Sequence, residues 1–242
     1  MATKAEIRAR VQRNLGRVGV STDESNDIDN WINYVIREDI CADHNWSGME
    51  STQTRTLTAS TDTYAFQNAT VFKDCAWIAI RYASGQDYQI LPEVSLDVIH
   101  DHTVWTEQSE GFPRCWARDG SSYVLRPIPD DTYAVRERVW QYPADFTVGS
   151  GGDSSTNFVT LYWPKLLEFG VSARGALYYN DLEAYQLWQQ AYETELRKAV
   201  SVDRRRLSRA RATMRVSTIA GRPSPGLPGF DIGARIPPYG WV

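Results

Sequence analysis

Two histidines carry the spacing that most suggests metal chemistry. His100 and His102 form an H-x-H pattern, with Asp97 and Asp101 nearby, and imidazole and carboxylate groups are ordinary zinc ligands. On a strand, side chains two residues apart share a face and could bind one ion, whereas on a helix they point roughly 200° apart. Because we expect a helix over this segment, a structural or solvent-exposed role is the favoured interpretation of the pair.

A second candidate for chemistry is His44, which lies close to Cys41 and Asp43. A cysteine–histidine pair acts as a nucleophile when a third group orients the imidazole, and the sequence places no such partner nearby. The carboxylates Asp130 and Asp131 follow a proline, where aspartate favours turns by bonding its own backbone. Phosphate-binding glycine loops, the G-x-S-x-G elbow and the H-E-x-x-H zinc motif are all missing. We therefore expect no catalytic residues, no metal ion and no cofactor.

The composition further limits the kind of protein that this chain can be. Hydrophobic residues make up 42% and aromatic residues 12%, enough for a packed core and for interfaces. The three cysteines, Cys41, Cys75 and Cys115, are widely separated and odd in number, which argues against a disulfide framework and favours synthesis in a reducing cytoplasm. No apolar run approaches the roughly 18 residues of a membrane span, and the first residues predict a helix start rather than a signal peptide. We expect a soluble protein with no membrane role.

One segment departs from the mild net charge of −4. Residues 201–215 hold six arginines against Asp203 alone, a net +5, so the rest of the chain carries −9. The six are Arg204, Arg205, Arg206, Arg209, Arg211 and Arg215.

Three interpretations of these arginines compete. They could form a solvated helix end that complements the helix dipole, bind the acidic surface of a protein partner through bidentate guanidinium–carboxylate pairs, or bind nucleic acid. The aromatic residues that interleave with basic ones in single-strand binding surfaces are missing here, and the negative remainder of the chain would repel phosphate. Direct nucleic-acid binding is therefore the least favoured of the three.

The last 26 residues, 217–242, differ in kind from the rest. They contain five prolines and five glycines, which exclude a regular element, yet they lack the polar, charged character of disordered tails. Their large apolar residues are Ile219, Leu227, Phe230, Ile232, Ile236, Tyr239 and Trp241. Burying them would yield on the order of 10–20 kcal/mol before the cost of ordering the segment. The segment either folds back on its own body or docks on another subunit or a partner ring, and we favour docking.

Helical periodicity dominates both ends of the chain. A T-x-x-E capping box at Thr3 and Glu6 opens a first helix that stops at Gly16, and a second covers residues 28–40 after a Ser/Thr/Asp-rich opening. The last third predicts a buried helix over 164–180 and a long one from Asp181 to about Arg215. The residues expected in the helical core are Trp31, Ile32, Leu166, Leu167, Trp188 and Tyr192.

The middle of the chain has strand texture. Alternation predicts a hairpin within 51–67, a strand over 74–82, and a hairpin over 111–131 that turns at Asp119-Gly120. A further strand over 133–142 places Tyr133, Val135, Glu137 and Val139 on one face. A helix opening at Pro92 is expected over about 92–106.

These elements predict an α+β protein that is mainly α. Residues 1–50 and 156–216 form a helical bundle with long C-terminal helices. Residues 51–155 form an inserted small antiparallel β region with one helix, and residues 217–242 form an extended Pro/Gly-rich docking arm.

Three blocks resemble the head-to-tail adaptor (connector) proteins of tailed bacteriophages. The first is the opening helix together with Asp27-Ile28-Asp29-Asn30-Trp31-Ile32-Asn33, which matches the D-I-x-x-W-I-N of that family's second helix. The second matches its hairpin through Gly111-Phe112-Pro113, Trp116, Gly120, Val124-Leu125 and Pro127-Ile128-Pro129-Asp130. The third runs from Asn157 through Pro164-Lys165-Leu166-Leu167 to Trp188, Tyr192 and Leu196. Together the blocks span about residues 3–205, and the long C-terminal arm departs from simpler members.

The resemblance implies a non-enzymatic virion protein at the head–tail junction, assembled in the host cytoplasm. It implies a dodecameric ring under the portal that encloses a channel for the genome. The implied partners are the portal protein, neighbouring adaptor subunits, tail or nozzle proteins and, transiently and without specificity, genomic DNA. The arginines 204–215 and the apolar arm residues would then bind the portal or a neighbouring subunit. The alternatives are a tail-completion or stopper protein and a nucleic-acid-binding module that uses the arginines.

Overall fold

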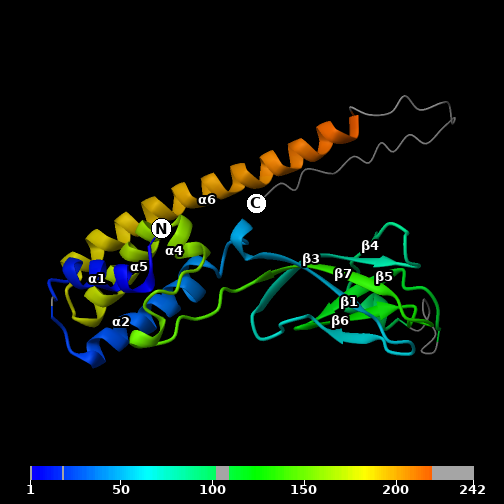
Figure 1. The fold of residues 1–242 in the computed structure, drawn as a ribbon, viewed down its shortest axis with the longest axis horizontal. Coiled ribbons are helices and arrows are strands. Elements are labelled where there is room, and N and C mark those ends of the chain that lie inside the picture. Colours follow the sequence, from blue (N-terminus) through cyan, green and yellow to red (C-terminus); the bar gives the residue numbers. More distant parts are fainter. Residues whose placement is uncertain (1, 18, 102–108, 220–242) are drawn as a thin grey trace. The chain divides into compact units, whose positions relative to one another are not determined.

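The computed structural model describes residues 2–17, 19–101 and 109–219, with side chains described as far as Arg206. Residues Met1–Arg204 form one compact unit and Arg205–Val242 a second. The protein is 43% helical and 22% strand, with two antiparallel sheets. The expected mainly-α helical bundle is therefore wrong, because short strands in the middle of the chain build two sheets rather than a minor insertion (Figure 1).

The helices form near both ends of the chain. In chain order the helical elements are α1 (Lys4–Asn14), α2 (Thr22–Tyr34), a π-helical segment η1 (Val35–Ile40), a 3-10 turn η2 (Ser47–Met49), α3 (Leu96–Ile99), a 3-10 turn η3 (Ser150–Gly152), α4 (Phe158–Tyr162), α5 (Pro164–Tyr178) and α6 (Leu182–Ile219). The predicted capping box of Thr3 and Glu6 is confirmed at the start of α1, and Ser21 with Glu24 repeats it at α2. Pro164 opens α5, where its missing N–H would be unpaired in any case.

Helix α5 is the centre of the helical core. Both α1 and α2 pack on it, and most of its residues between Leu166 and Ala176 are buried. A Cβ atom at Gly170 would lie 2.8 Å from Val35 Cγ1, and one at Gly175 would lie 2.5 Å from Leu15 Cδ1. Glycine at these positions therefore permits the close packing that the sequence predicts for this helix.

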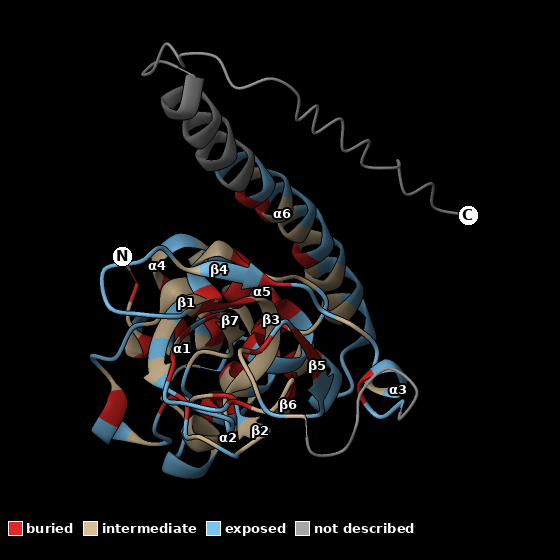
Figure 2. Ribbon diagram, turned by 90° about the vertical axis from the view of Figure 1, so that its right-hand side faces the viewer, coloured by how far each residue is buried: buried red, intermediate tan, exposed pale blue. Residues whose placement is uncertain are grey.

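The residues predicted for the helical core lie in or against it. Ile32, Leu166, Leu167 and Tyr192 are buried, and Trp31 packs partly buried against the same cluster. Trp188 is half-buried and stacks on Phe169 with ring centroids 5.8 Å apart. On α6 the buried residues up to Arg206 are Tyr192, Ala199 and Asp203, which share one face of the helix. Figure 2 shows the described part of α6 mainly in tan and pale blue, the colours of half-buried and exposed residues.

The strands form two sheets with their own core. They are β1 (Glu50–Thr56), β2 (Thr63–Ala65), β3 (Phe72–Arg81), β4 (Gln89–Leu91), β5 (Cys115–Asp119), β6 (Ser122–Arg126) and β7 (Ala134–Gln141). One sheet has the order β1-β7-β3-β4 and the other β2-β6-β5. The predicted face of β7 is confirmed, since Tyr133, Val135, Glu137 and Val139 are all buried. The hairpin at Asp119-Gly120 is also confirmed as β5–β6, with Gly120 at φ 57°.

The hairpin predicted within residues 51–67 is wrong. Strand β1 pairs with β7, from Glu50 opposite Trp140 to Thr56 opposite Ala134, whereas β2 pairs with β6. The two segments thus belong to different sheets. Alternation identifies which residues form strands, but the partner of β1 lies some 80 residues further along the chain.

The helix predicted over 92–106 is also wrong over its described part. Only Leu96–Ile99 is helical, and the residues before it extend along β5, with Val94 N donating to Trp116 O at 2.9 Å and Trp116 N donating to Pro92 O at 3.1 Å. Proline fits the edge of a sheet as well as the first turn of a helix, so Pro92 does not distinguish the two. Residues 102–108 lie outside the described part.

A buried charge network connects the first helix to the segment before α4. Lys4 and Asp29 are both fully buried, and Lys4 Nζ lies 2.9 Å from Asp29 Oδ2. The same ammonium donates to the carbonyl oxygens of Thr147 at 2.7 Å and Gly149 at 2.5 Å. Asp29 Oδ2 also accepts from the backbone N–H of Gly149 at 2.9 Å. Each buried charge therefore has several partners, as burial requires.

Arg8 completes this network at its outer side. Its guanidinium donates to both oxygens of Asp29, at 2.7 and 2.6 Å, and to Asp153 at 2.8 Å. Burial opposes the charge on Arg8, but the bonds to Asp29 and Asp153 outweigh it and raise the pKa of the guanidinium. Two cationic side chains of α1, those of Lys4 and Arg8, are thus fixed on the carboxylate of Asp29 in α2.

The side chain one turn after Asp29 extends the same contact. Asn33 Nδ2 donates to Phe146 O at 2.9 Å, and Phe146 N donates to Asn33 Oδ1 at 2.8 Å. Asp29 and Asn33 lie on one face of α2 because they are four residues apart. This face therefore holds the segment 146–149 by its backbone, and both residues belong to the first of the three sequence blocks.

We expect Asp29→Asn to destabilise the protein strongly. The amide cannot neutralise Lys4, and leaving a buried charge unpaired costs about 3–5 kcal/mol. The free energy of unfolding is measured by urea denaturation. Glu195→Gln is the matched control, because its partner Lys198 lies 2.7 Å away but is 64% exposed, and such pairs contribute less than about 1 kcal/mol. Equal effects of the two substitutions would contradict the network's role.

We expect Gly170→Val to destabilise the helical core by about 1–3 kcal/mol, because the new methyl groups collide with Val35 and Tyr192. The thermal midpoint measures the loss. Gln190→Val on the exposed face of α6 introduces the same side chain into a helix and should cost no more than about 0.7 kcal/mol. A Gly170→Val variant as stable as the control would refute close packing at this site.

Candidate interaction surfaces

Asp203 anchors α6 to the loop that follows η1. Its carboxylate is buried and accepts from Ser47 Oγ at 2.5 Å and from Ser47 N at 3.2 and 3.3 Å. His44 Nε2 lies 3.0 Å from the same group and packs edge-on against Trp46. In the sequence, Asp203 is only a negative charge among arginines. Its partner Ser47 lies 156 residues away along the chain, so no local sequence pattern reveals the contact.

The predicted partner-binding residues lie at and beyond this anchor. Arg204, Arg205 and Arg206 are exposed on α6. Arg209, Arg211 and Arg215 lie within the same helix, but their side chains are outside the described part. Helix α6 ends at Ile219, so the first residues of the predicted arm are helical. The remaining arm residues, Leu227, Phe230, Ile232, Ile236, Tyr239 and Trp241, lie outside the described residues.

A groove opens where η1, α5 and the first turns of α6 meet, and we call it the acidic groove. It has a volume of about 480 Å³ and is lined by residues from segments 38–43, 170–177 and 185–196. Its charged lining residues are Glu38, Asp39, Asp43, Glu193 and Arg174. Four carboxylates against one guanidinium give it a negative charge.

The base of the acidic groove contains an unpaired phenol. Tyr192 lines the groove and is 7% exposed, and its hydroxyl has no hydrogen-bond partner. Burial raises the pKa of Tyr192, and the charges of Asp39 and Asp43 raise it further. Although Asp39 keeps an exposed surface, desolvation raises the pKa of its carboxyl as well, assisted by Glu38 and opposed by Arg174. A cation in this groove would therefore meet acceptors that the fold leaves unsatisfied.

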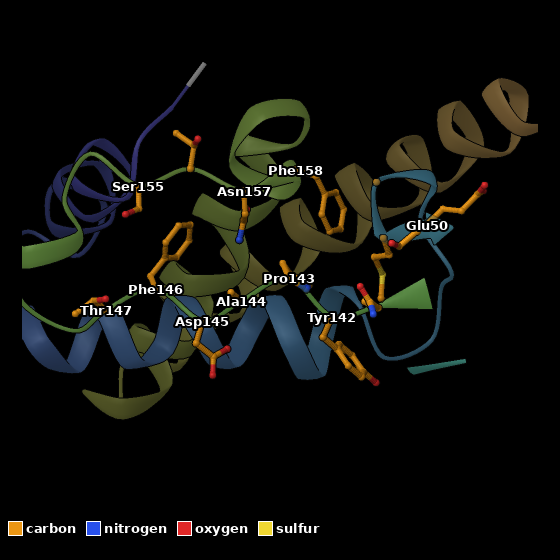
Figure 3. Close-up of a pocket in the computed structure, with 15 residues that line it drawn as sticks. Glu50, Tyr142, Pro143, Ala144, Asp145, Phe146, Thr147, Ser155, Asn157 and Phe158 are labelled. Atoms are coloured by element: carbon orange, nitrogen blue, oxygen red, sulfur yellow. The ribbon is translucent and has the colours of Figure 1, made fainter. Parts of the chain in front are cut away.

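A second groove of about 480 Å³ runs along the segment that α2 holds. Figure 3 shows its extended wall, Tyr142–Thr147, opposite Ser155–Phe158. Asn157 caps α4 through Thr160, while its Nδ2 is buried and has no hydrogen-bond partner. Its charged lining residues are Glu50 and Asp145, and each is paired with an arginine, Arg138 and Arg37 respectively.

The structure places most of the histidines and cysteines considered as catalytic or metal-binding candidates. His44 is committed to Asp203, and His100 caps the end of α3, while His102 lies outside the described residues. Within the described ranges, no three His, Cys, Asp or Glu side chains are grouped to hold a metal ion. Burial raises the pKa of the Cys41 thiol to about 12, and that of Cys75 to about 12, so both are protonated and poor nucleophiles at neutral pH.

Several large apolar side chains remain exposed near the turn between α5 and α6. Leu177 is 49% exposed, Tyr178 60%, and Leu182 and Leu187 61% each. Neighbouring exposed apolar residues mark protein contacts more often than isolated ones do. None of the helices in the described chain is both long and apolar enough to cross a membrane.

Comparison with known proteins assigns the family. No curated protein sequence matches the chain. The family model described as SU10 adaptor protein matches residues 2–217, which include every helix and strand described above apart from the last two residues of α6. The match contains the residues of all three sequence blocks, among them Asp29 and Asn33 of the α2 contact. The chain belongs to the SU10 adaptor protein family, as the resemblance to phage head-to-tail adaptors predicted.

Proposed function

We propose that this phage adaptor protein is a structural subunit of the virion's head–tail junction. Copies form a ring, twelve-fold by analogy with the family it resembles, that lies under the portal, connects it to the tail or nozzle proteins and encloses the DNA channel. The subunit assembles in the host cytoplasm, performs no catalysis and makes only transient, non-specific contact with DNA. The family match over residues 2–217 carries this proposal.

Surface chemistry supports an assembly role. The exposed apolar residues near the α5–α6 turn and the exposed arginines Arg204, Arg205 and Arg206 are features that a partner protein would cover. A ring closed by rotation needs two different, complementary patches on each subunit. A basic segment with a net +5 and a remainder with −9 supply opposite charges for such a pair.

The mass of the assembled complex tests the proposal. Native mass spectrometry of the full chain, alone and with portal rings, should detect a ring of adaptor copies bound to the portal. Recovery of tail proteins but never portal would favour a tail-completion or stopper role. DNA binding with a steep salt dependence that is lost when Arg209, Arg211 and Arg215 become alanine would favour a nucleic-acid-binding module.

We expect a chain that ends at Val216 to fold but to lose its attachment to the portal. The three hydrophobic clusters of the described residues all precede Arg204, so the thermal midpoint should stay within a few degrees of the full chain. The missing residues include the apolar side chains that we propose as the docking arm. Co-sedimentation with portal rings measures the attachment.

A length-matched control separates arm chemistry from arm length. It keeps all 26 residues and carries Phe230→Ser, Tyr239→Ser and Trp241→Ser. We expect it to lose attachment as the truncated chain does, because apolar burial drives the contact. A truncated chain that co-sediments at full affinity would remove the arm from the proposal.

A further inference from the structure

The acidic groove carries features that folding of one chain does not explain. Four carboxylates face one arginine across it. Glu38, Asp39 and Asp43 are exposed, and among the described residues none of them is held in a direct ion pair. The single arginine, Arg174, has its guanidinium 3.4 Å from the centre of the Tyr34 ring.

Tyr192 adds an independent indication of a ligand. Its hydroxyl is buried at the groove without a partner, and a buried polar group that lacks a hydrogen bond is costly. The oxygen can accept a hydrogen bond from a cationic donor. A ligand that donates several hydrogen bonds and carries positive charge would satisfy both the phenol and the carboxylates.

From these observations we infer that the acidic groove of one copy binds the arginine segment, residues 204–215, of a neighbouring copy. The inference rests on the proposed ring and specifies one of its contacts. A guanidinium has five donors in a planar fork that pairs with carboxylates in a bidentate manner. The apolar lining residues Ala173, Leu177 and Leu196 suit the methylene groups of arginine and the alanines and leucine between them.

The segment must come from another copy. Earlier turns of α6, from Tyr185 to Leu196, line the groove themselves, and α6 is one helix from Leu182 to Ile219. A continuous helix cannot fold its later turns back onto a face that its earlier turns form. The contact is therefore head-to-tail: each copy gives its arginine segment to one neighbour and its groove to the other, and such contacts close into rings.

Charge complementarity favours the arginine segment over nucleic acid as the occupant of the acidic groove. Nucleic acid would be repelled by the carboxylates of the groove. The segment 204–215 contains six arginines and no acidic residue, and all of it except Arg204 belongs to the second unit, whereas the groove belongs to the first. No other twelve residues of the chain are so basic.

A charge-swap experiment in the full chain tests the contact. The groove variant carries Asp39→Lys and Asp43→Lys, and the segment variant carries Arg209→Glu, Arg211→Glu and Arg215→Glu. The swap variant combines all five substitutions. The matched control, Glu183→Lys, reverses an exposed charge on α6 outside the groove lining.

Ring formation is measured by analytical ultracentrifugation over a range of protein concentrations, with and without portal rings. Thermal midpoints near that of the unmodified chain establish that each variant is folded. Opposed like charges cost several kcal/mol, and about 1.4 kcal/mol corresponds to tenfold. We therefore expect each single variant to need on the order of a hundredfold more protein for half-assembly, and the swap variant to regain most of the loss.

Mixing the two single variants gives a sharper result. The segment variant keeps an intact groove, and the groove variant keeps an intact arginine segment. Both contacts between them are complementary, because the arginine segment meets the acidic groove and the glutamate segment meets the lysine groove as in the swap variant. We expect alternating rings from an equimolar mixture at a concentration at which neither single variant assembles alone, rings from the swap variant and rings from the Glu183→Lys control.

The outcomes separate the two proposals. Rings from both single variants at the normal concentration would overturn the groove contact and leave the adaptor ring intact. Loss of portal binding by the groove variant alone, with the segment variant unaffected, would assign the groove to a basic portal segment and also overturn the inference. An unmodified chain that forms no ring, alone or on the portal, would overturn the ring itself and the contact with it.

Discussion

The fold depends on a small number of polar side chains on one face of α2. Asp29 accepts from Lys4, Arg8 and the backbone of Gly149, and Asn33 pairs with both backbone groups of Phe146. Helix α1 and the segment 146–149, which lies more than 100 residues beyond α2 in the chain, therefore meet at one face of α2. Because a buried charge is stable only with its partners in place, this junction either forms completely or opens, and it fixes the wall of the second groove.

Sequence reasoning succeeded where a few neighbouring residues determine the structure. The capping box of Thr3, the hairpin at Gly120 and the buried face of β7 each depend on local chemistry or on a short period. It failed where distant residues decide. Strand β1 pairs with β7 and not with β2, and Pro92 lies beside Trp116 in an extended segment. The mainly-α expectation had the same origin, since the periodicity of long helices gives a stronger sequence signal than strands of three to ten residues do.

The candidate surfaces divide in the same way. Composition alone identifies the arginine segment and the apolar arm, because each is continuous in the sequence. The acidic groove is assembled from three separate segments, and its carboxylates are ordinary exposed residues until the fold brings them together. His44 and Asp203 show the same limit of sequence-based prediction. The two residues are 159 positions apart in the chain, yet their side chains are in contact in the folded protein.

The buried carboxylates are paired within one chain, whereas the exposed carboxylates of the acidic groove are available to a partner. Asp29 and Asp203 are buried, and the chain supplies each with several donors. Glu38, Asp39 and Asp43 remain exposed, where water stabilises their charge until a partner displaces it. Other buried polar atoms also lack partners, including Trp116 Nε1 in the sheet core and Asn157 Nδ2 at the second groove, but Tyr192 lines the groove that also contains the exposed carboxylates of Glu38, Asp39 and Asp43. An unsatisfied group that can be reached from outside is one that a second chain can satisfy, and the basic segment of the same sequence has the complementary charge.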